Sequence, residues 1–219
     1  MGIETPGRKY RSLVAVRIMI KFDEKRLIAD LRKMPDQTCA AFAAAAATRQ
    51  LCSYERTAKG ERRKSRSRPR EILNKLWDDL LKGAIDPGEW EALLREAEGL
   101  LIDEDDIAVI GGAWADDAIA SLLYAIRSVL GEKSQEAAWA ARRAYEAAYR
   151  AATRALKLKS IRPEDISAIN SHSFVQRELA RQADDLGSLR RGKIDEVRLR
   201  AFSDEILTAE EVKHIGLGA

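Results

Sequence analysis

Hydrophobic residues recur every three or four positions along most of the chain, which is the spacing typical of amphipathic helices. The first such pattern begins at Asp23, a favourable N-cap residue, and continues to Leu31. A second helix is predicted over residues 36–56, where seven alanines surround Phe42. Because alanine combines the highest helix propensity with a very small side chain, this helix is expected at the centre of the fold.

The later helices are predicted mainly from their boundary residues. One helix is expected to end at Gly83, and the next to begin at Asp86-Pro87 and end at Gly99. Two long helices are expected over 113–130 and over 134–157, the second capped by Ser134. A short helical turn from Pro163 to Ile169, a helix capped by Ser171 or Ser173, and a capping box of Thr208 with Glu211 are expected after them. The pattern therefore predicts an all-α protein: a compact bundle of about seven helices with alanine-rich central helices.

Shifts in composition divide the chain into three parts. Residues 1–21 are predicted to be a flexible leader, and residues 22–190 a helical domain interrupted by a basic connector at 59–70. Residues 191–219 are predicted to form a polar C-terminal extension.

Composition restricts the class of protein. Hydrophobic residues make up 46% and charged residues 33% of the 219 residues, which is typical of a globular chain. A net charge of only +3 argues against a protein devoted to coating nucleic acid. Cys39 and Cys52 would lie roughly 20 Å apart on one helix, too far for a disulfide, so reduced thiols and a cytoplasmic location are expected. The sequence shows no candidate membrane span.

The basic connector is the strongest local imbalance of charge. It holds seven basic residues and one acidic residue between Lys59 and Arg70. One interpretation is a contact with phosphate groups or with an acidic partner. The candidate residues are Arg62, Arg63, Lys64, Arg66 and Arg68. The alternative is a solvated loop, and the absence of aromatic residues disfavours base stacking on this segment.

Catalytic and metal-binding signals are weak. Acidic residues cluster at 103–106 and again at Asp116 and Asp117, and a metal-assisted hydrolase is one hypothesis for them. Their spacing is not that of an EF-hand, and the alternative is that they cap helices. His172 and His214 are the only histidines, and no nucleophile elbow or phosphate-cradling loop is present. We therefore expect no catalytic residue, no bound metal and no cofactor.

A stripe of charged and aromatic residues follows one side of the predicted helix at 134–157. Trp139 is followed at helical spacing by Arg143, Glu146 and Arg150. Tryptophan and arginine are enriched at the energetic centres of protein interfaces, which makes this stripe a candidate partner-binding site. The alternative is that another helix covers Trp139 within the same molecule.

Several short motifs are shared with a known family. They are Phe22-Asp23-Glu24, Tyr54-Glu55-Arg56, Leu76-Trp77, the segment from Gln135 to Glu146, and Phe174-Val175-Gln176. Together they resemble the YjaG-like bacterial proteins, a family of unknown function, over residues 22–189. The resemblance implies an all-helical cytoplasmic fold and supplies no catalytic residues.

These observations favour a non-enzymatic, helical protein-binding module. An immunity or antitoxin-like protein that binds a toxin is one form of this hypothesis, made by analogy with other small bacterial binders. The first alternative is an accessory protein that binds nucleic acid through the connector at 59–70, and the second is the metal-assisted hydrolase. Self-association into a homodimer is also compatible with the pattern.

Overall fold

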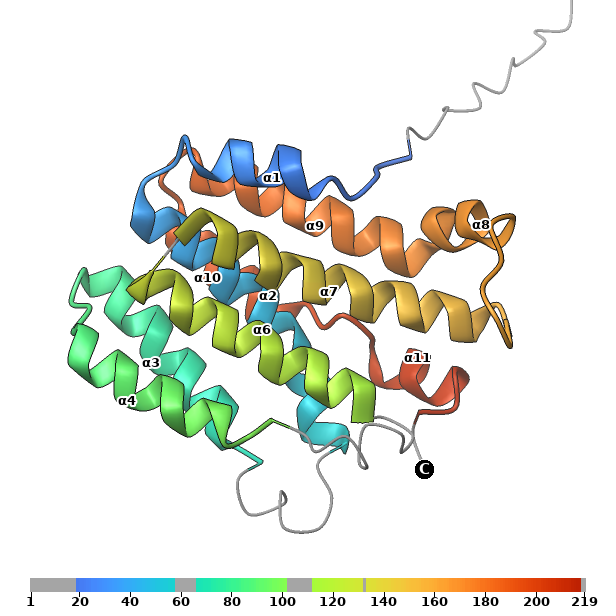
Figure 1. Cartoon of the computed structure of the whole chain (residues 1–219), viewed down its shortest axis with the longest axis horizontal. Helices are drawn as coiled ribbons and strands as arrows, with labels where there is room; N and C mark the ends of the chain where they lie inside the picture. The colour runs from blue at the N-terminus through green and yellow to red at the C-terminus, as the bar shows by residue number, and fades with distance from the viewer. Residues whose placement is uncertain (1–18, 58–65, 102–111, 132, 218–219) are drawn as a thin grey trace, which may run out of the picture.

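The computed structural model describes residues 19–57, 66–101, 112–131 and 133–217, and these residues form helices and connecting segments without any strand (Figure 1). In chain order the helices are α1 (Glu24–Leu31), α2 (Asp36–Thr57), α3 (Arg68–Lys82), α4 (Pro87–Glu98), α6 (Gly112–Leu130), α7 (Lys133–Ala155), α8 (Asp165–Ser171), α9 (Ser173–Leu189), α10 (Ile194–Ser203) and α11 (Ala209–His214). The all-α prediction is confirmed, but the described residues hold ten helices rather than about seven.

Helix α2 is the central element, as its alanines predict. Every residue from 38 to 51 is buried, so the helix is enclosed around its whole circumference. It packs against α3, α6, α7, α9 and α10. Alanines allow these neighbours to approach closely, and any polar group in this stretch must find its partners inside the protein.

Helices α6 and α7 pack side by side against α2, and α9 lies along the other side of α7 (Figure 1). The face that α7 buries is built almost entirely of alanines. At one close approach the hydroxyl of Ser121 on α6 donates to the carbonyl of Ala140 on α7, at 3.2 Å. Helix α1 covers α7 beside α9, whereas α3 and α4 pack on α2 and α6.

Several predicted helix boundaries are confirmed. Asp86 caps α4 by accepting from the N–H groups of Gly88 and Glu89. Gly83 ends α3 with φ of 64°, a left-handed conformation that favours glycine. Thr208 and Glu211 form the predicted capping box of α11.

Other boundaries correct the predictions. The N-cap of α9 is His172, whose Nδ1 accepts from the N–H of Phe174 at 3.3 Å, and not Ser171 or Ser173. Ser134 lies inside α7, which begins at Lys133 and ends at Ala155. The short helical turn predicted from Pro163 is α8, which begins at Asp165.

The C-terminal segment contributes to the core. The sequence assigns residues 191–219 to a polar extension, yet α10 packs against α2 and α9. Val197, Ala201, Ile206 and Leu207 are buried there. Apolar positions in this segment are few and lie between charged residues, which is why the sequence pattern predicts a polar extension. Within the described residues, no helix has the length and apolar character that crossing a bilayer requires.

Candidate functional site

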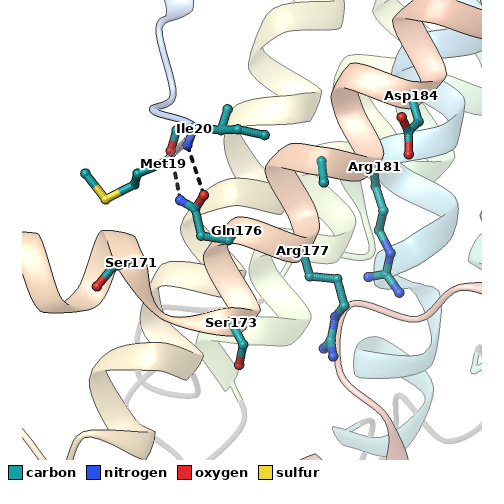
Figure 2. Close-up of a pocket in the computed structure, with 9 residues that line it drawn as sticks. Met19, Ile20, Ser171, Ser173, Gln176, Arg177, Arg181 and Asp184 are labelled. Carbon is teal, nitrogen blue, oxygen red and sulfur yellow. Dashed lines mark hydrogen bonds between the residues drawn. The ribbon is translucent and has the colours of Figure 1, made fainter. Parts of the chain in front are cut away.

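Helix α9 uses the amide side chain of Gln176 to hold the main chain of the N-terminal segment. Gln176 Oε1 accepts from the N–H of Ile20 at 2.9 Å, and its Nε2 donates to the carbonyl of Ile20 at 2.8 Å. The same Nε2 donates to the carbonyl of Asn170 at 2.7 Å. Gln176 points toward Ile20 in Figure 2, with both hydrogen bonds to that residue drawn. One side chain thus satisfies both main-chain polar groups of Ile20, as a residue on a neighbouring antiparallel strand would.

Two arginines of α9 hold a second segment on the other side. Arg177 Nη2 donates to the carbonyl of Ile206 at 2.8 Å, and Arg181 Nη1 donates to the carbonyl of Glu205 at 2.9 Å. Both guanidinium groups extend away from Ile20 in Figure 2. Helix α9 therefore carries neighbouring side chains that bind main-chain groups of two non-helical segments.

A groove of about 740 Å³ opens over α9 beside these contacts. It is lined by Met19, Ile20, Ser171, Ser173, Gln176, Arg177, Ala180, Arg181 and Asp184. Met19 and Ile20 are 37% and 38% exposed, so the groove presents aliphatic surface next to polar groups. The groove therefore places aliphatic surface beside polar side chains that bind main-chain groups.

The two groove arginines differ in how well their charge is neutralised. Arg177 forms a bidentate ion pair with Glu211, at 2.7 and 2.8 Å, and this pair is the main reason that the pKa of Glu211 is lowered. Of the carboxylates in the described parts of the chain, only that of Asp204 lies within ion-pair range of Arg181, at 3.7 Å. Burial lowers the pKa of Arg181, and the charges of Arg177 and Arg49 lower it further, although Glu178 and Asp204 oppose the shift. Arg181 is thus a partly buried cation with an incomplete counter-charge.

A buried ion network lies behind the groove, between α2, α9 and α10. Arg49 donates to Glu178 at 3.1 and 3.2 Å and to Asp185 at 2.6 Å. Arg200 donates to the other oxygen of Asp185 at 2.9 Å, and Gln182 donates to Glu178 at 2.9 Å. Burial alone would lower the pKa of Arg49, but Glu178 and Asp185 outweigh it and raise that pKa. The network fixes α9, and with it the groove, to the central helix.

Sequence patterns predict neither the groove nor this network. A charged Arg49 at the end of an alanine run was the one available signal, because a charge in a fully buried helix requires a partner. Its partner Glu178 lies 129 residues away in the sequence, so spacing cannot identify it. The same holds for Gln176, whose partner Ile20 is 156 residues away.

The predicted stripe on α7 is brought together around Asp117 of α6. Arg150 donates to Asp117 at 2.9 Å and Arg143 at 3.4 Å, and Glu146 lies 3.5 Å from Arg143. Asp117 is 1% exposed, and burial raises its pKa even though both arginines act to lower it. Trp139 is half-buried.

The ring of Trp139 is tilted against that of Tyr124 on α6, with the centroids 5.5 Å apart. The stripe therefore takes part in packing within the molecule. The arginines on it serve a buried carboxylate, which reduces what they can offer to a partner.

The basic connector falls partly outside the described residues. Arg62, Arg63 and Lys64 lie there, as do the acidic residues 103–106. Of the rest, Arg66 is exposed, and Arg68 is the first residue of α3, where it pairs with Glu71 and Glu96 at 3.0 and 2.5 Å.

No cluster of three or more histidine, cysteine, aspartate or glutamate side chains suited to a metal is found in the described part of the chain. Asp116 and Asp117 are adjacent on a helix, where side chains diverge, and Asp117 alone is buried.

Comparisons with known proteins support the fold. Residues 26–218 match the family described as "Protein of unknown function (DUF416)", in agreement with the resemblance to an uncharacterised helical family. No curated protein matched the chain. The crystal structure of a DUF416 family protein from Shewanella baltica OS155 is similar, with a TM-score of 0.63 and 16% sequence identity. The similarity covers 84% of this chain and 95% of that one, and at this identity it shows the fold alone.

Proposed function

The chain belongs to the DUF416 family of proteins of unknown function, and we propose that it is a non-enzymatic helical module that binds another protein. The proposed contact is the groove over α9. The observation that carries the proposal is the use of Gln176, Arg177 and Arg181 to bind the main chain of two non-helical segments beside a groove of about 740 Å³.

The groove is favoured over the α7 stripe as the partner-binding site because the polar groups of the groove are less fully paired within the molecule. On the stripe, Arg143 and Arg150 both point at Asp117, which is buried and needs them. In the groove, Met19 and Ile20 leave aliphatic surface exposed, and Arg181 has an incomplete counter-charge. A partner could bury this aliphatic surface and supply a counter-charge to Arg181, and both changes favour association.

An immunity or antitoxin-like role is one form of this proposal, in which the partner is a toxin. Its test is specific: the product of a neighbouring gene should co-purify with the chain, and the toxin's activity should fall when the two are mixed. The general proposal does not depend on this form.

Site-specific photocrosslinking in living host cells tests the general proposal. A benzoylphenylalanine placed at Ala180, which lines the groove, should give a crosslinked product with another protein. The matched control is Ala92, an exposed alanine on α4, on the opposite side of the bundle (Figure 1). The proposal fails if position 180 gives no product beyond that at position 92. A product made only of two copies of the chain would replace it with a homodimer.

A further inference from the structure

We infer that the occupant of the groove is an extended, acidic segment of the partner protein, which places a carboxylate on Arg181 and an aliphatic side chain against Met19 and Ile20. This inference rests on the proposed function and specifies the chemistry of the partner.

Comparison of the three neighbouring arginines Arg49, Arg177 and Arg181 indicates that Arg181 is the one suited to bind a carboxylate of the partner. Arg49 has two carboxylate partners within 3.2 Å, and Arg177 has a bidentate one in Glu211. Arg181 has the main-chain carbonyl of Glu205 at 2.9 Å and a carboxylate only at 3.7 Å. Among the described residues, its Nη2 has no hydrogen-bond partner. A guanidinium nitrogen forms a strong, charge-assisted hydrogen bond with a carboxylate, so this unused Nη2 is suited to one.

Burial strengthens the expected attraction. The side chain of Arg181 is only 17% exposed, and burial is the main reason that its pKa is lowered. An incoming carboxylate would offset the loss of solvation and would act where screening by water and salt is reduced. The same pairing on an exposed arginine would contribute little.

The dimensions of the groove fit an extended peptide. Gln176, Arg181 and Asp184 follow one another along α9 and all line the groove. From Gln176 to Asp184 the helix rises by about 12 Å. An extended chain covers that distance in about four residues.

The lining also defines which side chains would suit each position. Met19 and Ile20 offer aliphatic surface near Gln176, and Arg181 offers a positive charge near the middle. Asp184 at the far end repels a second acidic residue. The expected segment therefore has an aliphatic residue, then a single acidic residue, then a neutral or basic one.

Fluorescence polarisation with two labelled peptide pools tests this inference. Both pools contain short peptides of mixed aliphatic residues, and they differ only in carrying one glutamate or one glutamine. The unmodified chain should bind the glutamate pool about tenfold more tightly, since a charge-assisted hydrogen bond contributes roughly 1.4 kcal/mol or more. Arg181→Gln should remove this preference, and Arg181→Lys should retain part of it.

Arg142→Gln is the matched control, because it removes the same charge from an exposed site on α7 outside the groove. It should leave the preference intact, and circular dichroism should show that every variant is folded. The inference is overturned if the two pools bind equally, if Arg181→Gln retains the preference, or if millimolar inorganic phosphate displaces the glutamate pool as well as unlabelled peptide does. If these results coincide with a specific crosslink at Ala180, the protein-binding function stands and only the acidic partner is excluded.

Discussion

Arg49 offers the sharpest test of how the bundle is held together. Its guanidinium is 2% exposed and makes hydrogen bonds at 2.6, 3.1 and 3.2 Å to Asp185 and Glu178. Arg49→Met keeps a long, flexible side chain in place but removes the charge. Two carboxylates then stay buried without their main partner, although Arg200 still reaches Asp185.

The expected loss is large relative to the stability of a domain. Removing one partner of a buried ion pair costs about 3–5 kcal/mol, against a total stability of about 5–15 kcal/mol. With a slope of about 2 kcal/mol per molar urea, the unfolding midpoint should fall by about 1.5–2.5 M. Urea titration followed by circular dichroism at 222 nm, a standard helix signal, measures this shift.

A second variant separates the electrostatic explanation from simple loss of packing. In the unmodified chain, Glu178→Gln should destabilise the fold, because it removes a charged acceptor from Arg49. In the Arg49→Met background the same change should restore stability, because it removes an orphaned buried charge.

The reversal of sign is the decisive result. If Arg49→Met lowers the free energy of unfolding by less than about 1 kcal/mol, the network is not the strong buried interaction that its geometry indicates. If Glu178→Gln has the same effect in both backgrounds, the two residues are not coupled and the electrostatic reasoning is refuted.

Three further predictions follow from other buried groups. Thr48→Val should lower stability by about 1–3 kcal/mol in urea titration, because Trp77 Nε1 donates to the Thr48 hydroxyl at 3.0 Å and would lose its acceptor. Burial raises the pKa of Asp117, so the contribution of this carboxyl group to stability is largest below its ordinary pKa of 3.8 and declines as the pH rises. The Asp117→Asn variant should therefore gain stability relative to the unmodified chain between pH 4 and 7. A stability difference that stays constant over that range would contradict this prediction. Burial, with the charge of Asp36, raises the pKa of Cys39 to about 11, so at pH 8 this thiol should react with iodoacetamide only after unfolding.

Much of the fold could be predicted because its signals are local. Asp86 before Pro87, Gly83 after a helical pattern, and Thr208 three residues before Glu211 each act within one helical turn, and each marks a real boundary. The alanines of α2 likewise indicated a central helix. Where the cap was His172 instead of a serine, the local rule failed because an imidazole nitrogen can take the place of a hydroxyl oxygen.

The candidate site could not be predicted in the same way. Gln176 and Arg181 alternate with apolar residues along α9, and this pattern is typical of the solvent-exposed face of an ordinary amphipathic helix. Their partners are main-chain groups of Ile20 and Glu205, and a main-chain group has no residue-specific signature in the sequence. On α7 the sequence predicts a partner-binding stripe, and the structure shows that Arg143 and Arg150 of this stripe pair with Asp117 inside the molecule.

The enclosed alanines of α2 have a consequence for how this protein orders itself. An alanine side chain has no rotamers to restrict, so fixing residues 43–47 at the centre sacrifices backbone freedom only. Larger side chains there would lose rotational freedom as well, and they would force the neighbouring helices apart. Ordering the middle of the bundle therefore costs little side-chain conformational entropy, but the middle has no room for larger side chains. Substitutions that add bulk can be accommodated only toward the periphery.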